Sequence, residues 1–197
     1  MNDSPRPVLR IALLAAGYSR RLQSPKALAR VRGLSLLRRS AAVLAPFTAA
    51  RLIVVLPPHA ARYRAELRGI DAEILANRRR ALGLSTSVRA ALVRARCASA
   101  ILFVPVDLAA LQARDVARLI ALWRGHRRAI VARRIGAHGG TPLILPRAQF
   151  AAAARIEGDV GLRDFLRRCA APERRLLALP SAALDVDTPG DLRRARR

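Results

Sequence analysis

Residues 8–26 read VLRIALLAAGYSRRLQSPK, and two features of this stretch decide the fold prediction. The run 8–15 is apolar apart from Arg10, which is typical of a strand buried on both faces of a parallel sheet. A loop of small and polar residues follows and ends at Lys26. Gly17 tolerates a left-handed backbone, and main-chain N–H groups in such a loop can form an anion-binding concavity. The loop lacks the glycine spacing of the P-loop and of the dinucleotide fingerprint, so a plain strand-to-helix turn is the alternative.

Apolar runs alternate with amphipathic helical patterns along the rest of the chain. We expect further strands at 51–56, 72–76, 100–107, 127–132, 141–146, 174–180 and 183–187. Helices are expected near 34–45, 58–68, 85–96, 113–124, 147–154 and 160–170, and from Thr188 onward. This alternation predicts a three-layer α/β sandwich with a mainly parallel sheet, in a single domain over 1–197.

Three polar segments follow expected strands, at 14–26, 105–108 and 185–191. Ligands in open α/β sheets bind outside the carboxyl ends of the strands. The topology therefore predicts that all three segments lie at one edge of the sheet and form the binding site.

The composition excludes several classes of protein. Hydrophobic residues make up 52% of the 197 residues, which excludes a disordered chain. No stretch approaches the roughly 18 uncharged apolar residues of a membrane span. Cys97 and Cys169 are too few for a disulfide scaffold or an all-cysteine zinc site. Arg20 and Arg21 follow the first apolar run where a signal peptide would have small residues, so we expect a cytoplasmic protein.

The formal net charge is +24, and Lys26 is the only lysine among 37 cationic residues. The arginines are spread along the chain beside helical apolar stripes, and aromatic residues make up only 4%. This pattern favours solvated arginine faces with non-specific nucleic-acid association as a side effect, not as the function. A lysine retained at the end of the first loop indicates a task for a compact point charge, such as contact with phosphates. Chance placement is the alternative.

Two aspartates are candidate metal ligands. Asp107 ends an apolar strand, where a carboxylate must be paired, capped or bound to metal. The alternative is an aspartate that accepts hydrogen bonds from the N–H groups of the following loop. Asp187, with Asp185, forms a second acidic point late in the chain. Its alternative role is to cap the final helix, which has Pro189 in its first turn.

The segment LAAGYSRRLQSPKAL (14–28) resembles the signature LAAGxSxRMGxxKxL of the nucleotidyltransferases that activate molybdenum cofactor. Further resemblances follow in the same order along the chain: NRRRALGLSTSVRAAL (77–92), PVDL (105–108), GGTPLIL (139–145), GDVGLRDFL (158–166) and LDVDTPGDL (184–192). The two alanines before Gly17 are more similar to the cytidylyltransferase branch of this family. The resemblance implies a nucleotide-diphospho-sugar-transferase-like, Rossmann-like fold.

The resemblance also implies an activity. A Mg²⁺-dependent enzyme would transfer CMP from CTP to molybdenum cofactor (molybdopterin) and release pyrophosphate, with a molybdoenzyme or its chaperone as a protein partner. The attacking phosphate is already ionised, so no general base is required, which fits the absence of histidine from these segments. Two alternatives stay open: a nucleotidyltransferase for a sugar phosphate or another small acceptor, and a non-catalytic cofactor-delivery protein of the same fold.

The resemblance assigns roles residue by residue. Lys26, Arg21 and Asp107 are expected to be catalytic, and Asp107 and Asp187 to bind Mg²⁺. Nucleotide binding is expected at Leu14, Ala15, Ala16, Gly17, Ser19, Arg21, Lys26, Asn77, Ser85 and Ser87. Gly158, Asp159 and Arg163, at a helix start, are expected to bind the acceptor. For Ser85, Ser87 and Asp159, helix capping is the alternative.

Four positions depart from the family pattern. Gln23 stands where the family has glycine, Ala109 where it has proline, and Gly190 where it has glutamate. Thr141 stands where histidine or asparagine is common. These differences bear on the conformation of the first loop and on the choice of acceptor, whereas Lys26, Arg21 and Asp107 are intact.

Overall fold

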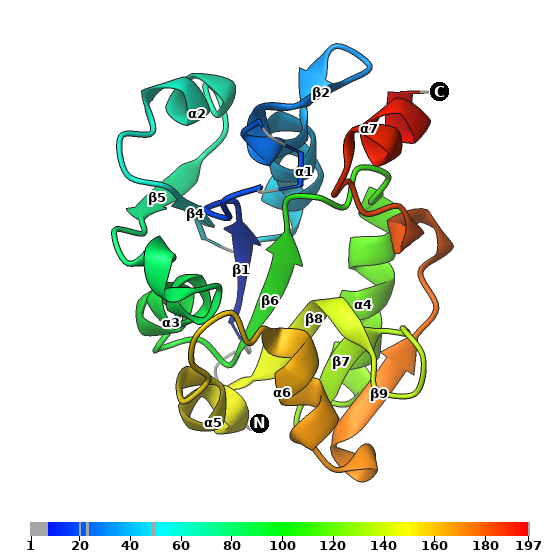
Figure 1. Ribbon diagram of the computed structural model, residues 1–197. Helices are drawn as coiled ribbons and strands as arrows, with labels where there is room; N and C mark the ends of the chain where they lie inside the picture. The colour runs from blue at the N-terminus through cyan, green and yellow to red at the C-terminus, as the bar shows by residue number, and fades with distance from the viewer. Residues whose placement is uncertain (1–7, 20, 23, 49, 197) are drawn as a thin grey trace.

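The computed structural model describes residues 8–19, 21–22, 24–48 and 50–196. Within them, seven strands form one sheet in the order β5-β4-β1-β6-β8-β7-β9 (Figure 1). Strands β5, β4, β1 and β6 are parallel, as are β7 and β9, whereas β8 is antiparallel to both β6 and β7. The predicted mainly parallel sheet is therefore confirmed. The strands are β1 (Leu9–Leu14), β4 (Leu52–Leu56), β5 (Ala72–Ala76), β6 (Ala100–Pro105), β7 (Ile130–Arg133), β8 (Gly140–Pro146) and β9 (Arg174–Leu177), and a separate hairpin consists of β2 (Arg30–Val31) and β3 (Leu34–Ser35).

The sheet has an apolar layer on each face because successive side chains of a strand point to opposite sides. In β1, Ile11 and Leu13 belong to one buried cluster, and Ala12 and Leu14 belong to the other. Both faces are covered, which explains why the strands at the centre of the sheet are continuous apolar runs.

Helices pack on both layers (Figure 1). Buried side chains of α1 and α4 join the cluster of Ile11, whereas those of α3, α5 and α6 join the cluster of Ala12. The predicted three layers are thereby confirmed. The helices are α1 (Leu36–Leu44), α2 (Ala61–Glu66), α3 (Ser85–Arg94), α4 (Ala113–Gly125), α5 (Phe150–Ala154), α6 (Leu162–Arg168) and α7 (Pro189–Arg196). Short 3₁₀ segments include η1 (Lys26–Leu28), η3 (Arg80–Leu82) and η6 (Pro180–Ala183). None of the described helices is long and apolar enough to cross a membrane.

The prediction of a late strand at 183–187 is wrong. This segment makes a single antiparallel bridge, between Leu108 and Asp185. Val186 is fully buried and its N–H donates to the carbonyl of Asp107. The segment is preceded by η6 and followed within two residues by α7, so no length is left for a ladder of hydrogen bonds.

Candidate active site

The loop after β1 turns around Ser19. Ser19 has a φ of 54°, and its carbonyl accepts a hydrogen bond from the N–H of Leu22 at 3.0 Å. Its Oγ accepts from the main-chain N–H of Lys26, also at 3.0 Å. Ser19 therefore ties the start of the loop to the residue that ends it. Arg20 and Gln23 lie outside the described residues, so the predicted effect of Gln23 is not addressed.

The ammonium group of Lys26 lies between two carboxylates. Its Nζ donates to Asp107 Oδ2 at 3.0 Å and to Asp187 Oδ1 at 2.5 Å. The Lys26 side chain is only 14% exposed. Burial by itself lowers the pKa of Lys26, but the charges and hydrogen bonds of Asp107 and Asp187 outweigh it and raise the pKa above 10.5. Lys26 is therefore cationic at neutral pH.

Main-chain contacts hold the two carboxylates opposite each other. Asp107 follows β6, and Asp187 precedes α7. The bridge between Leu108 and Asp185 and the bond from Val186 N–H to the Asp107 carbonyl join the two segments. Residues 80 positions apart in the chain thus contribute to one acidic pair.

Asp187 does not cap the final helix. The Thr188 Oγ1 accepts from the N–H of Asp191 at 3.2 Å, and the Asp191 carboxylate accepts from the N–H of Thr188 at 2.8 Å. This reciprocal pair forms a capping box at the start of α7. The capping alternative for Asp187 is therefore wrong. Thr188 and Asp191 cap the helix, and the carboxylate of Asp187 binds Lys26 instead.

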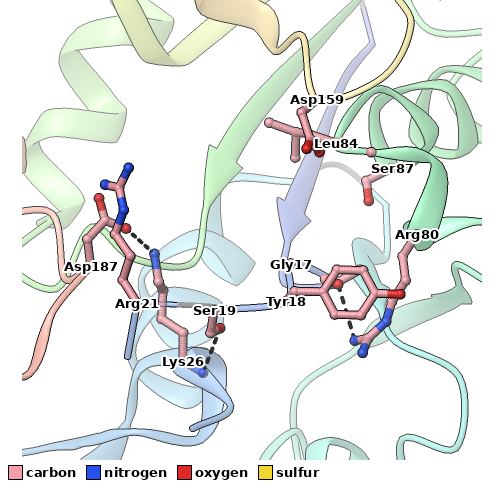
Figure 2. A pocket seen from close by; sticks show the side chains of 12 residues that line it. Gly17, Tyr18, Ser19, Arg21, Lys26, Arg80, Leu84, Ser87, Asp159 and Asp187 are labelled. Atoms are coloured by element: carbon pink, nitrogen blue, oxygen red, sulfur yellow. Dashed lines mark hydrogen bonds and ion pairs between the residues drawn. The ribbon is translucent and has the colours of Figure 1, made fainter. Parts of the chain in front are cut away.

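Two adjoining cavities, of about 270 and 170 Å³, lie at this edge of the sheet. Both are lined by Ala16, Gly17, Ser19, Lys26, Leu84 and Ser87. In the larger one, Figure 2 shows Lys26, Arg21 and Asp187 on one side and Tyr18 and Arg80 on the other. The smaller one reaches Asp107 and Thr141. The site is thus a cleft with cations at both ends of its larger part.

Arg80 and Tyr18 were not identified from the sequence. The guanidinium carbon of Arg80 lies 4.0 Å from the centroid of the Tyr18 ring, a cation–π contact. Arg80 Nη1 also donates to the carbonyl of Ala16 at 3.4 Å (Figure 2). These contacts fix Arg80 against the loop after β1 and aim a second guanidinium at the cavity. The only sequence signal was an aromatic residue within a loop of small and polar residues.

A family model described as the MobA-like NTP transferase domain matches residues 11–174. The chain belongs to the MobA-like NTP transferase domain family. The match includes the loop after β1, Asp107 and the segment 158–163, while Asp187 lies beyond it. Comparison with curated protein sequences gives no significant match.

Solved structures agree with this assignment. The protein Rv0371c from Mycobacterium tuberculosis H37Rv is 31% identical over 98% of each chain, with a TM-score of 0.77. Its complex with manganese gives 28% identity over 95% of this chain and 97% of that one, with a TM-score of 0.71. Molybdopterin-guanine dinucleotide biosynthesis protein A from Archaeoglobus fulgidus is 14% identical over 95% and 96%, with a TM-score of 0.73. A CMP:2-keto-3-deoxy-manno-octonic acid synthetase complexed with CTP is also 14% identical, over 96% and 97%, with a TM-score of 0.73. These last two matches show the fold, which is that of the nucleotide-diphospho-sugar transferases.

Most of the predicted nucleotide-binding residues of this MobA-like domain lie at the cleft. The cavities are lined by Leu14, Ala15, Ala16, Gly17, Ser19, Arg21, Lys26 and Ser87. Asn77 is buried instead, and its Nδ2 donates to the Oγ1 of Thr86 and the Oγ of Ser87. Asn77 therefore orients Ser87. Thr86 Oγ1 donates to the Gly83 carbonyl, and no side chain caps the start of α3, whose N-cap is Leu84, so the capping alternative for Ser85 and Ser87 is wrong.

Ser85 lies away from the cleft. It is fully buried and lines neither cavity, and its N–H donates to the carbonyl of Gly158 at 3.2 Å. The structure therefore does not place the Ser85 side chain where it could contact a nucleotide in the cleft. The main chain of Ser85 instead joins the loop before α3 to the loop before α6.

The predicted acceptor-binding residues are divided. Asp159 lines the larger cavity, whereas Arg163 is exposed and lines neither cavity. The capping alternative for Asp159 is wrong because α6 begins at Leu162 and its N-cap is Gly161. The Asp164 carboxylate serves there instead, accepting from the N–H of Gly161 at 3.5 Å. Gly158 contacts Gly83, so its backbone supports the cleft.

The acidic pair fits a hard divalent cation together with a nucleotide. Asp107 and Asp187 converge on one cationic atom, Lys26 Nζ, so their oxygens already share a cation. Among the described residues, no group of three or more His, Cys, Asp or Glu side chains fits a metal ion. Mg²⁺ typically needs only one or two carboxylates, because substrate phosphates and waters complete its octahedron. Asp107 and Asp187 are a donor set of that kind.

Proposed function

We propose that this protein transfers CMP from CTP to molybdenum cofactor (molybdopterin) and releases pyrophosphate, with Mg²⁺ as the metal. The observation that carries the proposal is the cleft itself. The loop after β1 lines both cavities, and Lys26, Asp107 and Asp187 meet where they adjoin. The double alanine before Gly17, similar to the cytidylyltransferase branch, supports CTP.

The cleft offers charge and close approach to a nucleoside triphosphate. Ala16 has only a methyl group and Gly17 has no side chain, so the triphosphate can lie against the main chain of the loop. Arg21 and Lys26 supply positive charge on one side, and Arg80 supplies it on the other. Phosphoryl-type transfer requires positioning and charge neutralisation more than covalent chemistry from the protein, and these side chains provide both.

The reaction balances without a protein base. A phosphate oxygen of the acceptor forms a bond to the α-phosphorus of CTP, and the bond from that phosphorus to the bridging oxygen of the β-phosphate breaks. The electron pair leaves with pyrophosphate, whose charge Lys26 and Arg21 would neutralise. No histidine lines either cavity, in agreement with an attacking group that is already ionised.

The metal would be held by Asp107 and Asp187 and would supply charge neutralisation at the phosphates. Lys26 neutralises this acidic pair in the absence of metal, and the raised pKa keeps it charged. With a divalent cation held by the two carboxylates, the ammonium of Lys26 would be available for phosphate oxygens. One residue thus serves both states of the site.

The acceptor side supports a second candidate substrate. Thr141 lines the smaller cavity next to Asp107, at the position where the resembling enzymes commonly have histidine or asparagine. A changed side chain at that wall favours a different small phosphorylated acceptor, such as a sugar phosphate.

With molybdenum cofactor as acceptor, the product would pass to a molybdoenzyme or its chaperone in the cytoplasm.

Pyrophosphate release tests the proposal. CTP, GTP and ATP are each mixed with Mg²⁺, the protein and purified molybdenum cofactor, and then with a panel of sugar phosphates. We expect release with molybdenum cofactor, fastest with CTP. Absence of release with every nucleotide and this cofactor contradicts the proposal. Release with a sugar phosphate alone supports the second acceptor, and nucleotide binding without turnover supports a delivery protein.

A matched pair of variants ties turnover to the acidic pair. Asp107→Asn removes one carboxylate charge from the site and is expected to lower kcat/KM by at least about a hundredfold, the scale of a lost charge-stabilising group. Asp71→Asn removes the same charge from an exposed ion pair with Arg51 and should leave kcat/KM unchanged.

A further inference from the structure

Most arginines among the described residues are exposed, whereas Arg133 is buried. It ends β7 and is 8% exposed, and no other arginine among the described residues is classed as buried. Burial of a guanidinium without partners is costly, so its contacts identify what it does. No local sequence pattern distinguishes Arg133 from the other arginines.

The guanidinium of Arg133 contacts the segment that leads to Asp187. Its Nη1 donates to the carbonyl of Ala182 and to Asp185 Oδ1, the latter at 3.2 Å. Burial raises the pKa of the Asp185 carboxyl, while Arg133 opposes this effect and the charges of Asp107 and Asp187 add to it. Three carboxylates thus lie near one another, and Arg133 engages the one that Lys26 does not.

Arg133 itself stands on a rigid element. Strand β7 is paired on both sides, with β8 and with β9, and the next residue also bonds to β9 through its main chain. Among the described residues, the segment 182–187 is paired by one bridge, to Leu108, and by the bond from Val186 N–H to the Asp107 carbonyl. Ala182 and Val186 are also buried in the core, and Asp187 contacts Lys26 and Asp191. The guanidinium is therefore a direct polar link between the sheet and a segment that forms no strand of that sheet.

We propose that Arg133 is a positioning residue, which holds the segment 182–187 through Ala182 and Asp185 and thereby fixes Asp187 opposite Asp107. In this arrangement Asp185 is a structural partner of Arg133, and the metal–nucleotide complex meets two carboxylates. The assignment of a metal to these carboxylates rests on the proposed function, whereas the effect of Arg133 on the Lys26–Asp187 contact does not.

The unique lysine gives a metal-free readout of this arrangement. In EDTA and without nucleotide, acylation of the Lys26 amine is followed by mass spectrometry, with the N-terminal amine as internal reference. The double variant Arg133→Met/Asp185→Asn removes one positive and one negative charge, so the net charge is that of the wild type. We expect Lys26 to be acylated several-fold faster in this variant, because Asp187 no longer holds Nζ.

A second readout addresses the metal. Binding of Mn²⁺ in the presence of CTP is measured from the loss of the free Mn²⁺ signal in electron paramagnetic resonance. The double variant should bind Mn²⁺ about tenfold more weakly, the usual cost of losing a group that orients a metal ligand. CTP binding in EDTA should change much less than Mn²⁺ binding, whereas a general loss of structure would weaken both.

Controls separate the possible outcomes. Arg134→Met/Asp71→Asn makes the same charge changes at exposed positions and should match the wild type in both measurements. Arg133→Lys keeps the charge with one compact donor group and should give intermediate values in both measurements. This variant replaces the double variant if the latter is unstable.

Unchanged acylation of Lys26 in the double variant overturns the proposal. A greater loss of Mn²⁺ binding in Asp185→Asn alone than in the double variant also overturns it, since Asp185 would then be a ligand. If wild-type protein binds no Mn²⁺ with any nucleotide, the proposed function fails and the acylation result still decides the role of Arg133.

Discussion

Lys26 is the single lysine among the 37 lysine and arginine residues of the chain. Its isolation among arginines predicts a task for a compact charge, and the structure places its ammonium between Asp107 and Asp187. A guanidinium is planar and broad, so it would meet two converging carboxylates in a different geometry. The pairing with carboxylates was not predicted, because the sequence does not show that Asp187 reaches the loop after β1.

The lysine should not be replaceable. Lys26→Ala is expected to lower kcat/KM for nucleotide transfer by at least about a hundredfold, through loss of charge at the phosphates and at the acidic pair. Lys26→Arg should also lose activity despite its retained charge. Steady-state pyrophosphate release measures both, with the exposed Arg114→Ala as control. Full activity of Lys26→Arg would show that the site needs a cation but not a lysine.

The raised pKa of Lys26 gives a pH dependence of stability in EDTA. A basic group whose pKa is higher in the folded than in the unfolded protein stabilises the fold fully below its unfolded value, near 10.5. That contribution is lost as pH rises through the folded value. The free energy of unfolding of the wild type minus that of Lys26→Met should therefore be constant from neutral pH to 10.5 and fall above it. Urea titrations across this range measure the difference, and a decline that begins below 10.5 contradicts the assignment.

The residues missed from the sequence share one cause. Arg80 reaches Ala16 across 64 positions, and Arg133 reaches Asp185 across 52. Neither position differs locally from the many other arginines, so only the folded sheet distinguishes them. Ser85 shows the converse error, because its place at a helix start suggested a ligand contact while its side chain is fully buried.

At the scale of elements, the strands were predictable where burial was complete. The runs that became β4 and β6 are apolar on both faces, as is β1 apart from Arg10, and their short length between loop residues favoured buried strands. The segment 183–187 alternates like a strand, yet its alternation serves Val186 in the core and two aspartates with separate cationic partners. Alternation identifies which side chains are buried but not whether a neighbouring strand is available.

The contact between the loops before α3 and α6 depends on Gly83. Its φ is +101°, and an added Cβ would lie 2.1 Å from the carbonyl carbon and oxygen of Gly158. Gly83→Ala should therefore displace the segment that carries Asp159 and destabilise the protein by more than about 2 kcal/mol. Gly69→Ala is the matched control, since Gly69 also has positive φ, +76°, but nothing within 4 Å. It should cost only about 1 kcal/mol of backbone strain.

Chemical unfolding and nucleotide affinity measure the two glycine variants. We expect Gly83→Ala to weaken CTP binding as well as stability, and Gly69→Ala to change stability alone. Equal losses of stability in the two variants would mean that the close approach of Gly83 to Gly158 relaxes without consequence.

At the scale of the whole molecule, the charge of +24 and the site are separate properties. Lys26 and Arg133 pair with Asp107, Asp185 and Asp187 at the site, whereas the cationic excess belongs largely to exposed arginines such as Arg114 and Arg118. The total charge therefore predicts how the surface behaves and does not predict the reaction.

The organisation of the chain as one domain over 1–197 stays a prediction.

That surface should bind RNA without sequence preference at low salt. Binding that rests on phosphate contacts weakens steeply with salt, by about three-hundredfold between about 50 and 200 mM for roughly six contacts with a single strand. Fluorescence anisotropy with two single-stranded RNAs of unrelated sequence should give the same affinity and the same slope. Lys26→Ala should bind RNA as the wild type does, because the Lys26 side chain is only 14% exposed and its ammonium is paired within the cleft, whereas the same change is expected to lower nucleotide transfer. Binding that survives high salt, prefers one sequence or requires Lys26 would place nucleic acid in the cleft and make it a competitor of CTP.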